Sequence, residues 1–566
     1  MNLSISKRKD GRVYLSIAQS YRKDGKTSTR TVQSLGYVDE LEKQYLDPIA
    51  HFKGVVDEMN KKRKEDCAPI TLSFTPEQKI DMRVIDNQLE LGYSILSRYY
   101  HLLGIDRFFA NRRMRGDFKY NPNSIFKLLV YERVLRPGSK SAAFSNKDRY
   151  LDRMDFSYDD LLRSLDFFAG YKKDLISWIN ERIAKMRDRD TSAAYYDITN
   201  YYFEVDTEND LRRRGVSKEK RKDPIVQMGL LMDKDGIPIT YQLYPGNTND
   251  CSTLLPVLKD ARERYHLGRT IVVADKGLNT SNNIAALILD GHGYVFSQSV
   301  RGADAELKTW VLDDTGYKGS ETFKVKSCQA NKTTYIQGPD GKTVKVDVPV
   351  KRVAYWSADY AARARHERET VLSKSLKLIS NSASYEHAKG YGAARYVKET
   401  VVEVSTGEVK KTVIEMDEAQ IAEDERFDGY YCIITSETKM TDQMIIDTYG
   451  GLWRIEETFR VTKSELETRP VHVWTRAHIE AHFLTCYVAL VLLRLIQAAT
   501  SFEHSAAKVI EAIRGIVGAR MKENYYLFSY RTELTDLLGA LIGQNLARQV
   551  YSKDDLRKIL AETKRV

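Results

Sequence analysis

The pattern of hydrophobic and polar positions changes three times along the chain. Up to about residue 80, short β-type runs alternate with turn signals such as Lys23-Asp-Gly25. From about 85 to 190, apolar residues recur at helical spacing, as at Leu161, Leu165 and Phe168. The pattern predicts a basic β-rich N-terminal region over 1–80 and a helical DNA-binding domain over 81–190, with the DNA role inferred from cationic turns.

Five β-type runs interleaved with two helical segments come next. Residues 192–203, 224–232 and 237–244 are predicted strands, and Asp233-Lys-Asp-Gly236 predicts a hairpin turn between the last two. A helix over 251–267, a strand over 269–275, a helix over 281–289 and a strand over 293–300 complete the order βββαβαβ. This order is that of an RNase H-like fold, an α/β mixed sheet flanked by helices.

Residues 301–426 differ in composition from the segments on either side. Alternation typical of exposed strands at 324–326, 344–350 and 400–405, divided by a charged helix over 361–379, predicts a β-rich insertion subdomain. The α/β core is therefore predicted in two parts, 191–300 and 427–500. Residues 501–566 are predicted to form a helical C-terminal domain.

The stretch from Tyr449 to Lys463 gathers acidic, basic and aromatic residues at helical spacing. Each residue of an α-helix turns by about 100°, so residues seven apart lie within roughly 40° of each other. On one helix, Tyr449, Glu456 and Lys463 would therefore share a stripe, with Arg460 beside them. The pattern indicates one acid set among cations, although a solvated helix face is the simpler alternative.

Two more acids lie on predicted strands of the same core. Asp197 lies within the first strand and Asp275 ends the fourth, and these strands are neighbours in the predicted fold. Three converging acids repel one another unless cations lie between them, and hard oxygen ligands suit Mg²⁺ or Mn²⁺. Glu457 and Glu465 compete for the third position, but Glu457 is turned about 100° from the stripe that holds Glu456.

Such a site fits phosphodiester chemistry on DNA. Two ions about 3.5 to 4 Å apart could activate a water or a 3′-hydroxyl and stabilise the leaving oxygen of an in-line displacement. Each acid alone also has an ordinary structural explanation, because Asp197 lies in a strand and Asp275 in the turn Ala274-Asp-Lys-Gly277. The three acids together predict metal-assisted cleavage and strand transfer.

Charge favours a polyanionic partner. Lys and Arg number 88 against 78 Asp and Glu, a formal net charge of +10. The loop over 212–222 is predicted to contact phosphates, with a solubilising loop as the alternative. Its predicted DNA contacts are Arg212, Arg213, Arg214, Lys220, Arg221 and Lys222.

Cysteine usage and hydropathy bear on the compartment. The five cysteines are scattered without a CxxC pair, which favours a reducing compartment and argues against a zinc knuckle or a disulfide frame. No signal peptide is recognisable at the start. The most apolar run, residues 482–497, is short and flanked by charge, so we predict a buried helix and no membrane span.

The chain resembles the insertion-sequence DDE transposases whose last catalytic segment reads Y-(2)-R-(3)-E-(6)-K, a bacterial and archaeal family with a retroviral-integrase-like fold. Further segments carry the resemblance: Tyr195-Tyr-Asp197-Ile-Thr, Tyr244-Pro-Gly-Asn247, Val273-Ala-Asp275-Lys-Gly277 and Phe427-Asp-Gly429. The resemblance implies that Asp197, Asp275 and Glu456 bind two Mg²⁺ or Mn²⁺ ions. It also implies that Tyr449 and Lys463 position DNA near the cut.

One position departs from this signature, because Leu452 stands where the signature has arginine. Arg454, two residues later, is the alternative source of that cation. Around the cut, the predicted DNA contacts are therefore Tyr449, Arg454, Arg460 and Lys463. In the insertion, Trp310 and Trp356 are candidates for stacking on an extruded base, with packing in a small core as the alternative.

The resemblance implies a transposase that binds the terminal inverted repeats of its element, cuts at the ends and joins them to target DNA. A homodimer is expected because two ends must be brought together. The expected location is the prokaryotic cytoplasm, at the nucleoid. Two alternatives remain: a metal-dependent nuclease without strand transfer, and a catalytically silent DNA-binding descendant.

Overall fold

A computed structural model describes residues 1–8, 10–23, 26–65, 88–114, 118–217, 221–265, 267–337, 343–380, 392–403 and 410–565 of the chain. They belong to two compact units, Met1–Val84 and Ile85–Val566, and each unit is described by itself. Lys220 and the domain boundary predicted near residue 80 lie outside the described residues.

The first unit is a three-stranded antiparallel sheet with helices. Its strands are β1 (Asn2–Lys7), β2 (Val13–Lys23) and β3 (Lys26–Tyr37), in the order β1-β2-β3. Helix α1 (Val38–Leu41) follows, and α2 (Pro48–Glu65) contacts β1. The β-type runs thus predict the sheet, whereas α2 was not predicted because its charge-rich second half, MNKKRKE, has little apolar periodicity.

The second unit is built on a nine-stranded mixed sheet in the order β10-β11-β12-β15-β9-β8-β5-β6-β7. The order βββαβαβ is as predicted. Its elements are β5 (Ala193–Tyr202), β6 (Ile225–Asp233), β7 (Pro238–Pro245), α9 (Leu254–Tyr265), β8 (Ile271–Ala274), α10 (Ser281–Leu289) and β9 (Gly293–Gln298). Strand β8 pairs in parallel with both β5 and β9, so the carboxyl ends of these strands meet at one edge.

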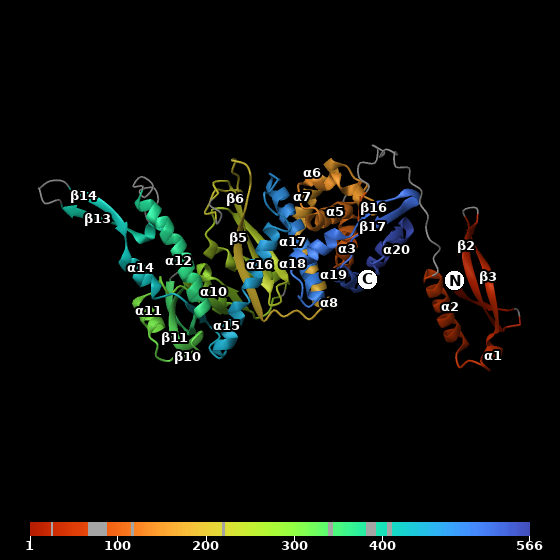
Figure 1. Ribbon diagram of the computed structural model, residues 1–566, viewed down its shortest axis with the longest axis horizontal. Coiled ribbons are helices and arrows are strands. Elements are labelled where there is room, and N and C mark those ends of the chain that lie inside the picture. Colours follow the sequence, from red (N-terminus) through yellow and green to blue (C-terminus); the bar gives the residue numbers. More distant parts are fainter. Residues whose placement is uncertain are drawn as a thin grey trace. The chain divides into compact units, whose positions relative to one another are not determined.

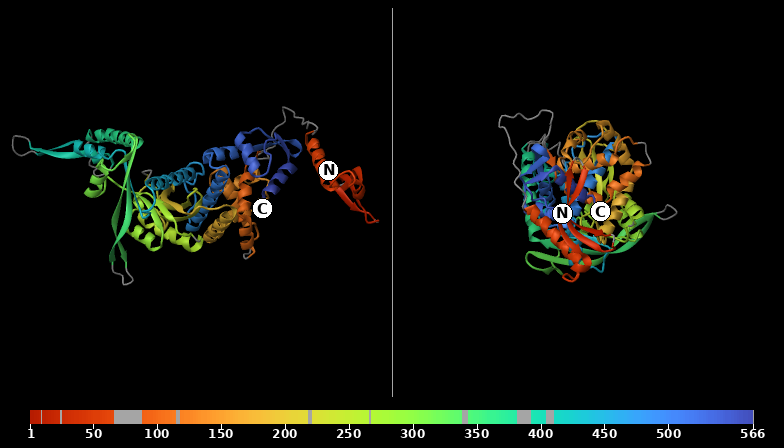
Figure 2. Two further views of the ribbon diagram at one scale, coloured as in Figure 1. Left: turned by 90° about the horizontal axis from the view of Figure 1, so that it is seen from below. Right: turned by 90° about the vertical axis from the view of Figure 1, so that its right-hand side faces the viewer.

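The insertion mostly extends this sheet instead of forming a separate subdomain, which corrects the prediction. Its strands β10 (Lys318–Gly319), β11 (Phe323–Gln337) and β12 (Thr343–Ser357) join the sheet through β15 (Tyr430–Thr435), which pairs with β9. Only β13 (Val397–Glu403) and β14 (Lys410–Met416) form a hairpin apart from it. Helices α11 (Ala305–Leu312), α12 (Ala358–Ile379) and α14 (Glu418–Glu425) gather with them at one end of the sheet, as Figure 1 and the left view of Figure 2 show.

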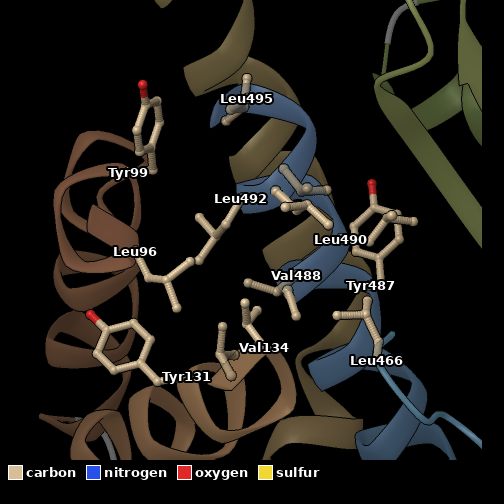
Figure 3. Packing of buried hydrophobic residues seen from close by; sticks show 14 of the residues in the cluster. Leu96, Tyr99, Tyr131, Val134, Leu466, Tyr487, Val488, Leu490, Leu492 and Leu495 are labelled. Carbon is tan, nitrogen blue, oxygen red and sulfur yellow. The ribbon is translucent and has the colours of Figure 1, made fainter. Parts of the chain in front are cut away.

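Helices from both ends of the second unit form its largest core. The predicted helical region contains α3 (Tyr93–Leu102), α4 (Ile105–Arg113), α5 (Pro122–Leu135), α6 (Lys140–Ser145), α7 (Tyr158–Gly170) and α8 (Lys172–Met186). Helix α17 (Arg476–Ala499) packs against α3, α5 and α7. In Figure 3, Leu96 and Val134 point towards Leu492 and Val488 of α17.

Helix α17 is long and apolar enough to cross a membrane by length and composition, but 94% of its most apolar window is buried inside the protein. A core helix passes the same test of length and composition. The burial agrees with the buried helix that the sequence predicts.

The C-terminal segment contains short strands, which the sequence does not predict, as well as helices. Helices α18 (Ala506–Gly515), α19 (Glu533–Leu541) and α20 (Lys553–Thr563) accompany β16 (Val517–Arg520), β17 (Tyr525–Phe528) and β18 (Val550–Ser552). These strands form a sheet in the order β18-β17-β16-β4, where β4 is Gln88–Glu90. Strands of three or four residues are too short to show a reliable period of two.

Candidate active site

The stretch from Tyr449 to Lys463 belongs to two helices, not to the single helix that its spacing predicts. Helix α15 (Asp442–Gly450) ends at a pair of glycines, and α16 (Trp453–Lys463) begins two residues later. Tyr449 therefore lies on α15 while Glu456 and Lys463 lie on α16, so one helix does not carry all three residues. Gly451 leaves no room for a side chain, because a methyl group there would lie 1.8 Å from the hydroxyl oxygen of Tyr195.

Helix α16 lies along β5 (Figure 1), held at both ends by contacts with tyrosines of that strand. Gly451 meets Tyr195 at one end, and the Tyr201 hydroxyl is 2.7 Å from Thr462 Oγ1 at the other. Odd-numbered residues of β5 share a face, so Asp197 also faces α16. Two strand residues span about 7 Å and five helix residues about 7.5 Å, so Asp197 and Glu456 lie at a similar height along the pair.

The parallel pairing of β5 and β8 points towards a position of Asp275 near Asp197. Tyr195 is paired with Val273 across β5 and β8, and carrying that register two residues further brings Asp197 next to Asp275. Asp275 follows the last residue of β8 and begins a short 3-10 helix, Lys276–Leu278. Its side chain is exposed, while that of Asp197 is half-buried.

Asp275 and Glu456 line one cavity of about 390 Å³, which Tyr449 also lines. Glu456 is exposed at the border of the buried face of α16, whose residues Ile455 and Phe459 pack inward. Asp197 is not among the lining residues of this cavity. The structure thus brings two of the three predicted acids to one cavity and sets the third on the adjoining strand.

Two hydroxyl groups contact one oxygen of Asp275, and a third contacts one of those two. Ser297 of β9 donates a hydrogen bond to Asp275 Oδ1 at 2.7 Å, and the Tyr449 hydroxyl makes a longer contact of 3.5 Å with the same atom. The hydroxyls of Tyr431 and Tyr449 are 2.7 Å apart. Burial raises the pKa of both tyrosines, so both act as neutral donors near neutral pH. Neither Ser297 nor Tyr431 had been singled out from the sequence.

Glu457, an alternative to Glu456, has a structural partner. Its carboxylate accepts a hydrogen bond of 2.8 Å from Arg494 of α17, whose side chain is only 4% exposed. Arg494 also donates to Thr458 and, at 2.9 Å, to Gln497. This buried ion pair ties α16 to α17 and leaves Glu456 as the acid of α16 that reaches the cavity.

The three candidate acids carry the type of ligand atom that divalent cations prefer. Asp197, Asp275 and Glu456 supply carboxylate oxygens, the ligands that Mg²⁺ and Mn²⁺ prefer. Within the part of the chain that the structure describes, no three His, Cys, Asp or Glu side chains lie close enough together to hold a metal ion as they stand. Binding of one ion by all three carboxylates at once would therefore require that one or more of them turn towards the others.

The predicted cations around the acids lie at different places along α16. Arg454 packs beside Gly236 in the turn between β6 and β7, and its guanidinium lies 5.3 Å from the Trp453 ring. Lys463 lies at the other end, 5.8 Å from the Tyr201 ring. Arg460 is exposed in a second cavity, of about 620 Å³, which it shares with Glu456.

Residues of the basic loop are already engaged within the protein to differing degrees. Arg212 is only 6% exposed and lies 5.4 Å from the Phe203 ring, so in this structure it packs inside the loop. Arg213 and Arg214 pair with loop acids, and Arg221 stacks 3.8 Å over the ring of Tyr202. Lys222 is exposed.

The tryptophans of the insertion pack in a small core. Trp310 is partly buried against a small hydrophobic cluster that includes Leu307, Val311 and Phe427. Trp356 donates from Nε1 to the Asp428 carbonyl at 3.0 Å. Trp453 and Trp474 are instead 56% and 54% exposed. In this structure Trp310 and Trp356 therefore pack in a small core, which was the alternative to stacking on an extruded base.

The contact at the helix break gives a direct test of how α16 is placed. We expect Gly451→Ala to displace α16 and to destabilise the protein by about 1 to 3 kcal/mol, because the added methyl overlaps Tyr195. Gly450→Ala is the matched control, since nothing lies within 4 Å of its added methyl. Thermal unfolding would compare them, and equal melting temperatures would contradict the close approach.

Comparison with known families gives the class of this α/β protein. The family model described as the transposase DDE domain matches residues 205–492, just over half of the chain, so the chain belongs to this family. Residues 3–70 match the N-terminal domain of IS1634 family transposases, which makes the protein an insertion-sequence DDE transposase. The longer match includes Asp275 and Glu456 but begins after Asp197.

The likeness of the chain to a solved transposase structure is weak. A cryo-EM structure of the piggyBac transposase synaptic complex with hairpin DNA is 10% identical, covering 78% of this chain and 76% of that one. Its TM-score of 0.34 is too low to bear on the details of this fold. No curated protein matches the chain.

Proposed function

We propose that the chain cuts DNA at the ends of its insertion sequence and joins those ends to target DNA, with Asp197, Asp275 and Glu456 as the metal-binding residues. The observation that supports the proposal is that Asp275 and Glu456 line one cavity. The β5–β8 pairing ends at Tyr195 and Val273, and its continuation by two residues would bring Asp197 next to Asp275. Divalent ions such as Mg²⁺ or Mn²⁺, two in this proposal, would supply Lewis acidity and a more acidic bound water.

The chemistry needs no further co-reactant. In the cutting step, a water oxygen forms a bond to phosphorus while the P–O3′ bond breaks, which leaves a 3′-hydroxyl and a 5′-phosphate. In the joining step, that 3′ oxygen bonds to phosphorus in the target strand, whose own P–O3′ bond breaks. Cutting replaces a phosphoester bond with a bond from phosphorus to the water oxygen, and joining replaces one phosphoester bond with another. Positioning of the reacting atoms is therefore the main task of the protein.

We propose that cations of α16 and of the loop after β5 hold the DNA backbone. Arg460, Lys463 and Lys222 lie on α16 or on the loop after β5, and Arg213, Arg214 and Arg221 would have to leave acidic or aromatic partners of their own loop to join them. Arg454 is proposed as a further contact at the turn between β6 and β7. A homodimer is proposed because two element ends must be processed together.

The test uses the full chain, a labelled duplex that ends in the terminal inverted repeat of its element, and a supercoiled target plasmid. With Mg²⁺ we expect cut ends and joined products, and with EDTA neither. Asp275→Asn should still bind the duplex but make neither product, because one proposed ligand is lost.

Other results would change the proposal. If Asp275→Asn cuts as fast as the wild type, the proposed ligand set is wrong. If the wild type cuts without joining, the protein is a nuclease of the same fold. If the wild type binds the repeat and makes no product under any metal, the silent descendant is the better description.

A further inference from the structure

A chain of hydrogen bonds leads from the insertion to Asp275. Lys332 of β11 donates from Nζ to Asn279 Oδ1 at 2.7 Å. Asn279 donates from Nδ2 to the carbonyl of Ser297 at 3.0 Å, and Ser297 Oγ donates to Asp275 Oδ1 at 2.7 Å. Three side chains from three different segments therefore connect the longest strand pair of the insertion to a candidate metal ligand.

The chemistry of the groups decides which atom donates and which accepts in this series of hydrogen bonds. An ammonium group can only donate, so Lys332 requires the oxygen of the Asn279 amide to face it. The amide nitrogen must then face Ser297, where it meets a carbonyl that can only accept. Ser297 is 2% exposed and lies beside Asp275, because Ala274 and Phe296 pair across β8 and β9 just before them.

A second contact holds the same loop. Thr334, two residues after Lys332 and on the same face of β11, donates to the carbonyl of Ser281 at 2.7 Å and is fully buried. The loop from Asp275 to Ser281 is thus held against β11 at two places. The insertion also contributes Tyr360 of α12 to the wall of the cavity.

The two carboxylate oxygens of Asp275 differ in their hydrogen bonding. Among the described residues, every hydrogen bond to this carboxylate goes to Oδ1, from Ser297 and at longer range from Tyr449. Partners that bind a ligand side chain from behind orient it and typically change metal affinity by about 10- to 100-fold when they are removed. Oδ2 is the oxygen left for an ion.

We propose that Lys332, Asn279 and Ser297 are positioning residues through which the insertion fixes the Asp275 carboxylate for metal binding. This inference rests on the proposed function, because it assumes that Asp275 is a metal ligand. It assigns the insertion a role in the metal site itself, in addition to any contact with DNA.

The test measures Mn²⁺ binding to the full chain by the loss of the free Mn²⁺ signal in electron paramagnetic resonance, without DNA or turnover. Ser297→Ala should weaken binding about 10- to 100-fold, and Ser297→Thr, which keeps the hydroxyl, should restore most of it. Asn279→Ala and Lys332→Met should weaken binding by smaller factors, because they act through Ser297. Ser299→Ala is the matched control, since Ser299 lines the same cavity without contacting Asp275.

The outcomes separate this inference from the proposed function. If Asp275→Asn loses Mn²⁺ while Ser297→Ala binds it like the wild type, the positioning role is overturned and the metal site stands. If Asp275→Asn binds Mn²⁺ like the wild type, the proposed metal site itself fails. A lower melting temperature of Ser297→Ala with unchanged Mn²⁺ affinity would also overturn the inference, because it would show a structural role only.

Discussion

Replacing Arg494 with methionine is expected to destabilise the protein by about 3 to 5 kcal/mol, the usual cost of leaving one partner of a buried ion pair alone. Arg494 is 4% exposed and donates to Glu457, Thr458 and Gln497, so its loss leaves a half-buried carboxylate unpaired between α16 and α17. Urea unfolding of the wild type and the variant would measure the difference.

Arg476→Met is the matched control on the same helix. Arg476 pairs with Asp210 at 2.6 Å, but both side chains are more than half exposed, and such surface pairs are worth at most about 1 kcal/mol. The double variant Arg494→Met, Glu457→Met should recover much of the lost stability, because well-packed apolar residues can replace a buried ion pair. Equal effects of Arg494→Met and Arg476→Met would show that the buried pair does not hold α16.

Substitutions of the two neighbouring glutamates of α16 are expected to have different effects, one on the cutting rate and the other on stability. Glu456→Gln should slow cutting of the element end by about a thousandfold or more, equivalent to about 4 kcal/mol in the barrier, with little change in stability, because Glu456 is exposed and lines the cavity. Glu457→Gln should keep the chemistry and lower the melting temperature, because Arg494 loses its charged partner.

Cutting rates and melting temperatures of both variants would decide between them, and Glu465→Gln serves as a further control on the same segment. If Glu457→Gln were inactive but stable while Glu456→Gln remained active, the acid of α16 would have been assigned wrongly. Binding of the terminal repeat, measured in parallel, would show that loss of cutting is not loss of DNA binding.

Much of the fold could be predicted because its elements have clear periods. The run from β5 to β9 appears in the predicted order, and the buried α17 was expected from its composition. The break before α16 is not predicted because Gly450 and Gly451 are tolerated within helices, and the sequence does not show that Gly451 lies against Tyr195. That the insertion strands continue the core sheet depends on pairing between β12 and β15, segments 80 residues apart, which no local pattern shows.

The candidate acids could be found from the sequence, but their surroundings could not. Ser297 is an unremarkable residue of a buried strand, and its role depends on the register of two parallel strands. Charge alone likewise could not separate Arg212, which packs inside its loop, from the exposed Lys222. Which polar groups face a site is decided by long-range pairing, and a single sequence contains little information about it.

Three acids far apart in the chain are proposed to hold the same metal ions, and Fe²⁺ offers the most direct test. With Fe²⁺ in place of Mg²⁺, ascorbate and peroxide generate hydroxyl radicals at the bound ion, and mass spectrometry locates the backbone cuts. We predict cuts around Asp197, Asp275 and Glu456 together, all suppressed by excess Mg²⁺. Cuts at only one of these segments, or at other acids that Mg²⁺ does not protect, would contradict a shared metal site.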